Sequence, residues 1–291
     1  MNSQSVQTIQ QGAPRYSTAQ VGDLSIHYDL SDYRDPWREE APQTLLLYPG
    51  YCRNVEFWRA WVPLLGREYR ILRMDARGYG YTSKPPEGSP LNIDQLAGDA
   101  LGLMDALGLE RVHWVGESTG GAVGMWAALT HPDRIASITL CNTTARMRNE
   151  THGKYAVGEA DQESALRKFG VEAWCKMTLA GRMDLSNAPP GLGDWVAREM
   201  ARTPVHIAIA AFKLFSTIDL FPELGRIQAP VLQVVGNKCA ESRKKLVEEM
   251  RDAFPHAKLV YVDGVDNGIH FLAPDLVTAE VRAFLQENFS G

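Results

Sequence analysis

Short apolar runs alternate with amphipathic stretches along most of the chain. The apolar runs are bounded by Gly, Pro or charged residues, which is typical of strands buried in a sheet. They lie at residues 24–28, 44–48, 70–74, 112–115, 136–141, 231–235 and 259–262. Between the later runs, apolar residues recur at helical spacing, at residues 93–107, 121–130, 242–254 and 275–288. This alternation predicts a mostly parallel sheet with helices on both faces.

The alternation is interrupted between residues 143 and 224. This segment contains few candidate strands, and its large apolar residues recur at helical spacings. We therefore expect residues 1–142 and 225–291 to form an α/β core and residues 143–224 to form a helical cap. Most of the Met and aromatic residues in the segment are explained by helix packing, and lining a substrate pocket is the alternative. The candidates for such a lining are Trp174, Trp195, Met177, Met183, Met200, Phe212 and Phe215.

Composition and charge argue against several classes of function. The 291 residues are 45% hydrophobic and carry a net charge of −5, so we expect a large core and no broad positive surface for nucleic acid. No run approaches the roughly 20 apolar residues of a membrane span, and residues 1–16 lack the apolar region of an export signal. The four cysteines are widely spaced, which fits neither a disulfide framework nor a zinc cluster. These features predict a cytoplasmic protein without a metal, a cofactor, a membrane partner or a nucleic-acid partner; they leave the oligomeric state open.

A serine occupies a glycine-rich turn in the middle of the chain. Residues 116–120 read Gly-Glu-Ser-Thr-Gly, directly after the apolar run at 112–115 and before a helix of small residues. Gly-x-Ser-x-Gly between a strand and a helix is the pattern of a nucleophile elbow. The glycines are needed because side chains beside the strained serine would clash with the strand and the helix. A glycine-rich turn with an idle serine is the alternative interpretation.

Together with three further motifs, this turn resembles the α/β-hydrolase superfamily over nearly the whole chain. Residues 75–80 read Asp-Ala-Arg-Gly-Tyr-Gly, which is similar to the family's turn after the fourth strand. Residues 131–134, His-Pro-Asp-Arg, are similar to its linker before the sixth strand, and residues 268–271, Gly-Ile-His-Phe, to its catalytic-histidine loop. The resemblance implies an α/β-hydrolase fold with a helical cap inserted after strand six.

The resemblance also implies roles for individual residues. Ser118 would be the nucleophile and His270 its general base, because a serine hydroxyl needs a base within hydrogen-bond reach. The backbone N–H groups of Thr119 and Tyr51 would stabilise the oxyanion. Since only a neutral imidazole accepts the serine proton, kcat/KM is expected to rise with pH through about 6.5.

The third member of the family's catalytic triad is absent from both of its usual positions. After the seventh strand, residues 236–239 read Gly-Asn-Lys-Cys instead of Gly-x-x-Asp, and the sixth strand is followed by Asn142 rather than an acid. Glu241 lies two residues beyond the empty position, and Asn142 offers an amide oxygen that can orient an imidazole. Asp263 and Asp266 are further candidates, and a serine–histidine pair could also act without a third member.

The resemblance implies a serine hydrolase that cleaves a carboxylic ester, lactone or related acyl compound through an acyl-enzyme intermediate. The aromatic-rich cap suggests a small, mainly apolar substrate. Dehalogenases and epoxide hydrolases of similar fold use Asp at the elbow, where this chain has Ser118.

Two different functions are compatible with the same residues. Residues 47–53, Leu-Tyr-Pro-Gly-Tyr-Cys-Arg, resemble a turn of the cofactor-independent quinoline-type dioxygenases, which act on heteroaromatic substrates. Arg53 replaces the histidine of that turn, however, and the sixth-strand Asp of those enzymes is absent here. The second is ligand binding by a catalytically idle member of the fold, because such a protein would not require the missing acid.

Overall fold

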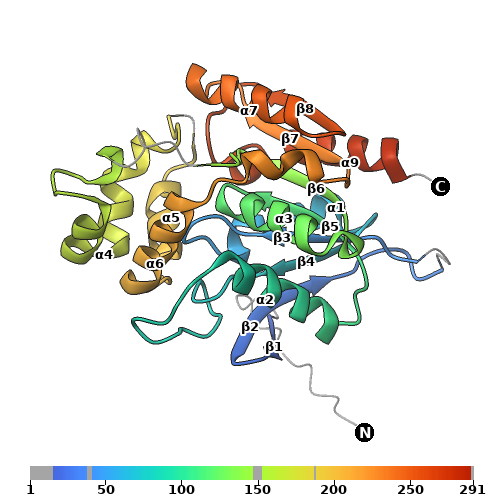
Figure 1. Cartoon of the computed structure of the whole chain (residues 1–291), viewed down its shortest axis with the longest axis horizontal. Helices are drawn as coiled ribbons and strands as arrows, with labels where there is room; N and C mark the ends of the chain where they lie inside the picture. Colours follow the sequence, from blue (N-terminus) through green and yellow to red (C-terminus); the bar gives the residue numbers. More distant parts are fainter. Residues whose placement is uncertain (1–15, 38–40, 147–152, 187, 290–291) are drawn as a thin grey trace, which may run out of the picture.

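A single twisted sheet runs through the centre of the computed structural model, which describes residues 16–37, 41–146, 153–186 and 188–289 (Figure 1). Its strands within these residues are β1 (Ser17–Val21), β2 (Leu24–Ser31), β3 (Thr44–Tyr48), β4 (Arg70–Met74), β5 (Val112–Glu117), β6 (Ile135–Cys141), β7 (Val231–Gly236) and β8 (Ala257–Val262). The strand order is β1-β2-β4-β3-β5-β6-β7-β8. β2 pairs antiparallel with β1 and β4, and the remaining neighbours are parallel. The strand before Ser118 is therefore central, between β3 and β6.

Helices cover both faces of the sheet. They are α1 (Trp61–Leu65), α2 (Ile93–Ala106), α3 (Thr119–Thr130), α7 (Glu241–Ala253), α8 (Ile269–Leu272) and α9 (Pro274–Phe289). All residues of β3 are buried, and they alternate between two apolar clusters. Leu46 belongs to the cluster with α2, α3 and α7, whereas Leu45 and Leu47 belong to the cluster with α1 and α9. The pleat of a strand sends successive side chains to opposite faces, so a strand covered on both sides is apolar throughout.

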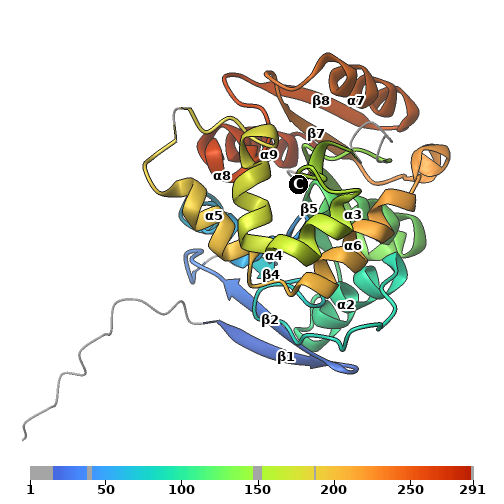
Figure 2. The same ribbon diagram turned by 90° about the vertical axis from the view of Figure 1, so that its left-hand side faces the viewer.

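Three longer helices lie between β6 and β7 and are called the cap helices here: α4 (Gln162–Thr178), α5 (Leu192–Met200) and α6 (Val205–Thr217). They gather to one side of the sheet in Figure 1 and face the viewer in Figure 2. A separate apolar cluster joins them to Cys52 and Phe57 of the loop after β3. The cap helices are thus packed onto the loop after β3, and β3 is a neighbour of β5 in the sheet.

The structure confirms the predicted fold class and adds one strand to the prediction. Each predicted apolar run lies within or overlaps a strand, whereas β1 was not predicted because most of its side chains are exposed or polar.

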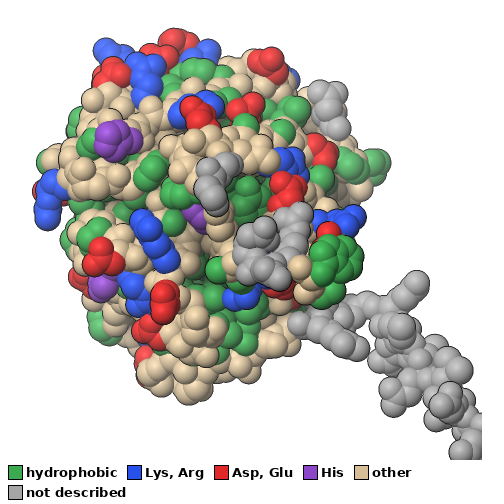
Figure 3. Space-filling view, turned by 90° about the vertical axis from the view of Figure 1, so that its right-hand side faces the viewer, with side chains coloured by type: hydrophobic (Ala, Val, Ile, Leu, Met, Phe, Trp, Pro, Cys, Tyr) green, Lys and Arg blue, Asp and Glu red, His purple; other side chains and the backbone are tan. Residues whose placement is uncertain are grey.

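The four cysteines are buried and free. No helix in the described part of the chain is long and apolar enough to cross a membrane. On the face seen in Figure 3, acidic and basic side chains are interspersed. The expectation for the chain start rests on residues 1–15, which lie outside the described residues.

Candidate active site

Ser118 stands between β5 and α3 in a strained backbone conformation. Its φ of 51° and ψ of −119° are unusual for a residue with a side chain. The Ser118 N–H donates to the Cys141 carbonyl at 3.0 Å, and its carbonyl accepts from the Gly121 N–H at 3.1 Å. A Cβ placed on Gly116 would lie 2.5 Å from the backbone of Gly120, so a side chain does not fit there. These contacts have the geometry of a nucleophile elbow.

The two expected oxyanion donors lie beside this turn. Thr119 is the first residue of α3, and Tyr51 follows β3. Within the described part of the chain, no protein hydrogen bond occupies the backbone N–H of either residue. The Tyr51 hydroxyl donates to the Ala208 carbonyl of α6 at 2.9 Å and accepts from the Gln162 amide of α4 at 3.2 Å. Tyr51 therefore contacts two cap helices through its side chain and leaves its N–H available.

His270 lies on the short helix α8 and is completely buried. Its ring lies against Trp58, with 4.5 Å between ring centroids, and neither ring nitrogen has a hydrogen-bond partner among the described residues. Burial, with a further contribution from the charge of Arg53, holds the pKa of His270 well below its usual 6.5. The imidazole is therefore neutral at pH 7, although no hydrogen bond joins it to Ser118 in this structure.

Glu241 does not approach the imidazole of His270. It is the first residue of α7, its side chain is 86% exposed, and it forms an ion pair with Lys244 at 3.3 Å. The side chain therefore points to solvent from the first turn of the helix, where a carboxylate is favourable for the helix dipole.

Asn142 is buried and ties three segments together. Its side-chain amide donates to the Asp266 carbonyl at 2.6 Å and to the Asn267 side chain at 3.1 Å, and its oxygen accepts from the Gly236 N–H at 3.0 Å. Asp263 accepts a hydrogen bond from the Asn237 side chain at 2.6 Å. In the described part of the chain, no carboxylate therefore forms a hydrogen bond with the His270 ring.

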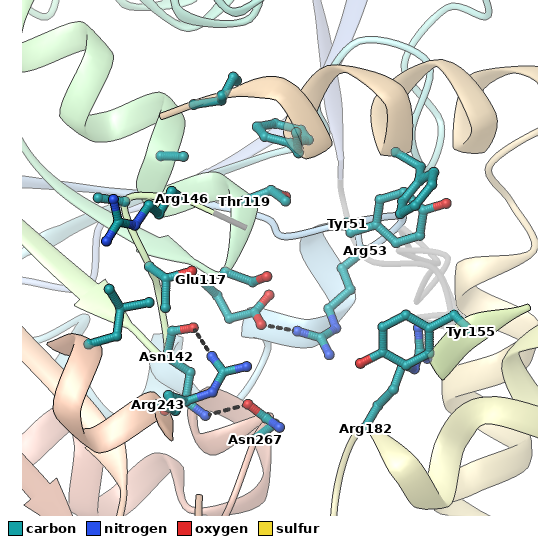
Figure 4. A pocket seen from close by; sticks show the side chains of 18 of the residues that line it. Tyr51, Arg53, Glu117, Thr119, Asn142, Arg146, Tyr155, Arg182, Arg243 and Asn267 are labelled. Carbon is teal, nitrogen blue, oxygen red and sulfur yellow. Dashed lines mark hydrogen bonds and ion pairs between the residues drawn. The ribbon is translucent and has the colours of Figure 1, made fainter. Parts of the chain in front are cut away.

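A cavity of about 370 Å³ adjoins Ser118 (Figure 4). The elbow and the turn after β3 contribute Ser118, Thr119 and Tyr51, and the cap helices contribute Trp174, Phe212 and Phe215. Among the described residues, its charged lining consists of Arg53, Arg146, Arg182 and Arg243 and a single acidic side chain, Glu117. The cavity thus joins an aromatic part to a strongly cationic part.

Of the cap residues for which pocket lining was the alternative, Trp174, Phe212 and Phe215 line the cavity. Met183 and Met200 are buried among the cap helices, and Met177 is 46% exposed. Trp195 packs against Phe57, with 4.9 Å between ring centroids. The three methionines follow the helical period because they pack the cap or face solvent, which agrees with helix packing rather than with the alternative of a pocket lining.

The comparison with known proteins identifies the family. The profile described as alpha/beta hydrolase fold matches residues 43–271. The chain belongs to the α/β-hydrolase fold family. The family match covers most of the chain, and strands β3 to β8 and the elbow between β5 and α3 lie within the matched region.

Relatives within the family are named for several activities. The crystal structure of the enol-lactonase from Burkholderia xenovorans LB400 has a TM-score of 0.81 and is 26% identical, covering 93% of this chain and 100% of that one. A pimeloyl-acyl-carrier-protein methyl ester esterase of Aliivibrio salmonicida is 26% identical over 256 residues, or 86% of this chain and 95% of that protein. A fluoroacetate dehalogenase of a Burkholderia species is 40% identical over 123 residues, but the match spans only 38% of that protein.

One feature of this family member was not predicted from its sequence. Arg53 and Glu117 form an ion pair in which the two residues are only 8% and 3% exposed. In the part of the chain that the structure describes, Arg53 Nε and Glu117 Oε2 are buried without a partner. A Cβ on Gly50 would collide with the Glu117 carboxylate, so this glycine makes room for the acid. The available signal was a charged residue, Glu117, at the end of the otherwise mostly apolar strand at residues 112–117, because a buried charge requires a counterion.

The described residues also hold no group of three or more His, Cys, Asp or Glu side chains arranged to bind a metal ion. The charged side chains that line the cavity, within the described ranges, are the four arginines and Glu117.

Proposed function

We propose that this α/β-hydrolase is a serine hydrolase that cleaves a carboxylic ester or lactone through an acyl-enzyme intermediate. Ser118 carries the proposal, because its hydroxyl-bearing side chain is held in the elbow conformation at the wall of the cavity. The backbone N–H groups of Tyr51 and Thr119 lie beside it without protein partners among the described residues. Such donors stabilise the negative oxygen that forms when a nucleophile attacks a carbonyl.

In the proposed reaction, Ser118 Oγ bonds to the acyl carbon, and the bond to the leaving oxygen breaks. The serine proton passes to His270 and then to the leaving oxygen. Water then attacks the acyl-enzyme with His270 again accepting a proton, which releases the carboxylic acid and restores Ser118. Because burial lowers the pKa of His270, the imidazole begins the cycle unprotonated and with a free position for a proton.

The proton transfer requires a movement. No hydrogen bond connects His270 to Ser118 in the described structure, and His270 is not part of the cavity wall. A base must come within about 3 Å of the proton it accepts, and such contacts often tighten only when substrate is bound. The imidazole and the serine hydroxyl therefore approach each other in the substrate complex.

The substrate class is supported by two further observations. Relatives that match most of their own length include an enol-lactonase and a methyl ester esterase, and both names describe cleavage of an acyl–oxygen bond. The serine at the elbow also differs from the Asp that dehalogenases of similar fold use there. The cavity volume and its aromatic side chains fit a small acyl compound with an apolar part.

The proposal is tested by covalent labelling with a fluorophosphonate, followed by intact-mass measurement and peptide mapping. We expect one adduct on Ser118 and loss of both the adduct and p-nitrophenyl ester turnover in Ser118→Ala. Ser242→Ala is the matched control, because this serine also lines the cavity but lies outside the elbow. Labelling elsewhere, or full ester turnover by folded Ser118→Ala, would remove the serine mechanism.

A further inference from the structure

Two of the arginines in the cavity have no acidic partner among the described residues. Arg53 pairs with Glu117, and Arg146 pairs with Asp219 at 3.6 Å. Arg182 and Arg243 form no ion pair with any carboxylate in the described ranges, although both line the cavity. Since isolated charges are costly to remove from water, a partly buried guanidinium normally has a counterion.

The contacts of Arg182 are with neutral, weakly accepting groups. One Nη donates to Cys175 Sγ at 3.1 Å and to Met200 Sδ at 3.2 Å, and the guanidinium carbon lies 5.0 Å from the centre of the Trp174 ring. Its Nε is buried and has no acceptor among the described residues. The cap thus holds this guanidinium in place, and within the described ranges neither this donor nor its positive charge has a partner.

Arg243 reaches the cavity from the opposite structural layer. It belongs to α7 in the core, and one Nη donates to the Asn142 carbonyl at 3.3 Å. This neutral contact fixes the guanidinium near the end of β6. Figure 4 shows Arg53, Arg182 and Arg243 along one side of the cavity, with Thr119 on the other side.

Tyr155 lines the cavity together with these arginines. Burial is the main reason that its pKa is raised, and the positive charges of Arg182, Arg243 and Arg53 all oppose that rise. Asp266 adds a negative charge near the same phenol, although it is not part of the cavity wall. The phenol and the guanidinium groups therefore share one region of the pocket.

We infer that the substrate carries a carboxylate in addition to its ester or lactone group, and that Arg182 and Arg243 bind this carboxylate. The inference rests on the proposed function and specifies its substrate class. Guanidinium groups match the two oxygens of a carboxylate and are weakly hydrated, so they suit this role better than lysines. The aromatic side chains Phe212 and Phe215 are then available to the carbon chain between the carboxylate and the reacting carbonyl.

Binding is measured without turnover by titrating Ser118→Ala calorimetrically with monomethyl glutarate and with dimethyl glutarate, its neutral analogue. We expect the monoanion to bind at least tenfold more tightly. Arg182→Gln and Arg243→Gln, each added to Ser118→Ala, are expected to weaken monoanion binding at least tenfold and to leave the neutral diester almost unchanged. Arg251→Gln is the matched control, because this exposed arginine lies on α7 away from the cavity.

Circular dichroism and thermal unfolding of each variant establish that it folds. Arg182→Lys, which keeps the charge but loses the planar fork, is expected to retain intermediate affinity and serves if Arg182→Gln unfolds. Equal binding of monoester and diester would overturn the inference, as would inorganic phosphate binding more tightly than monomethyl glutarate. Selective binding of the monoester without fluorophosphonate labelling of Ser118 would instead retain the carboxylate site and reject the proposed hydrolase mechanism.

Discussion

The imidazole of His270 is surrounded by aromatic rings rather than by polar partners. Both ring nitrogens lack hydrogen bonds in the described structure, and Trp58 and Phe271 lie against the ring. Placing a proton on such a ring would bury a charge beside Arg53, so the neutral form is strongly favoured. The usual histidine pKa of about 6.5 therefore does not predict the pH at which kcat/KM begins to fall in acid.

The pH profile of ester turnover follows from this environment. We expect kcat/KM to stay level as the pH falls through 6.5 and to decline only well below it, because the free enzyme binds the inhibitory proton weakly. This differs from the expectation from the sequence, in which kcat/KM rises with pH through about 6.5. Rates measured in constant-ionic-strength buffers, with folding monitored at each pH, test it. An acid limb centred at 6.5 would mean that His270 is solvated in the active enzyme.

Glu241 and Asn142 should differ in the effects of their removal. Glu241→Gln is expected to change kcat less than twofold, because its side chain is 86% exposed and pairs with Lys244. Asn142→Ala should lower the unfolding free energy by about 1–3 kcal/mol, because the buried Gly236 N–H loses its acceptor. Steady-state kinetics and urea unfolding of both variants distinguish the effects. A loss near 10⁴ in kcat for Glu241→Gln would restore it as a triad member.

At the scale of secondary-structure elements, the cap helices contribute two different surfaces. One surface carries Trp174 into the cavity, where it also packs against Arg182. The other packs Trp195 onto Phe57 of the core. The same segment therefore determines the cavity wall and the attachment of the cap.

The two tryptophans form a matched pair for testing this division. Trp174→Ala should change the ranking of ester substrates of different chain length by tenfold or more in kcat/KM, because apolar contacts in a pocket are worth roughly 1–3 kcal/mol per methylene. Trp195→Ala should lower the melting temperature and leave the ranking unchanged, because it does not line the cavity. If Trp174→Ala lowered kcat/KM by the same factor for every ester, this residue would have only a structural role.

At the scale of the whole molecule, folding lowers the pKa of a second buried histidine, His113. His113 lies on the central strand β5, joined to the Ser137 hydroxyl by a 2.9 Å hydrogen bond, and burial lowers its pKa from 6.5 to about 4. The unfolded chain binds the proton near pH 6.5 and the folded chain does not. This contribution to stability is therefore complete above pH 6.5 and is lost as the pH falls toward 4.

Unfolding in urea at several pH values tests this coupling. Between pH 6.5 and 4, the wild-type protein should lose about 3 kcal/mol more stability than His113→Gln, from 1.36 kcal/mol for each pKa unit. His256→Gln, at an exposed histidine, is the control and should follow the wild type. Parallel curves for His113→Gln and the wild type would contradict the assignment.

The sequence predicted those features that neighbouring residues determine. The inner strands follow from apolar runs, and the elbow around Ser118 follows from glycines within a few positions of it. β1 was missed because Ser17, Thr18 and Gln20 are polar residues of an edge strand that pairs only with β2. Local composition carries little information about such a strand.

The charged part of the candidate site could not be predicted in the same way. Arg53 follows β3 and Glu117 ends β5, whereas Arg182 and Arg243 come from the cap and from α7. Their proximity depends on how distant segments pack, which residue spacing does not encode. The aromatic cap therefore suggested a mainly apolar substrate, whereas the assembled cavity is also rich in guanidinium groups.

Tyr51 connects the cap helices to the elbow: its side chain contacts the cap, and its backbone lies beside Ser118. Its hydroxyl bridges α4 and α6, and its backbone N–H is available beside Ser118. A poorly fitting substrate that displaces the cap helices would therefore also misalign the proposed oxyanion donor. Discrimination between substrates would then be expressed in the rate of the chemical step as well as in binding, because the proposed oxyanion donor also contacts the cap helices.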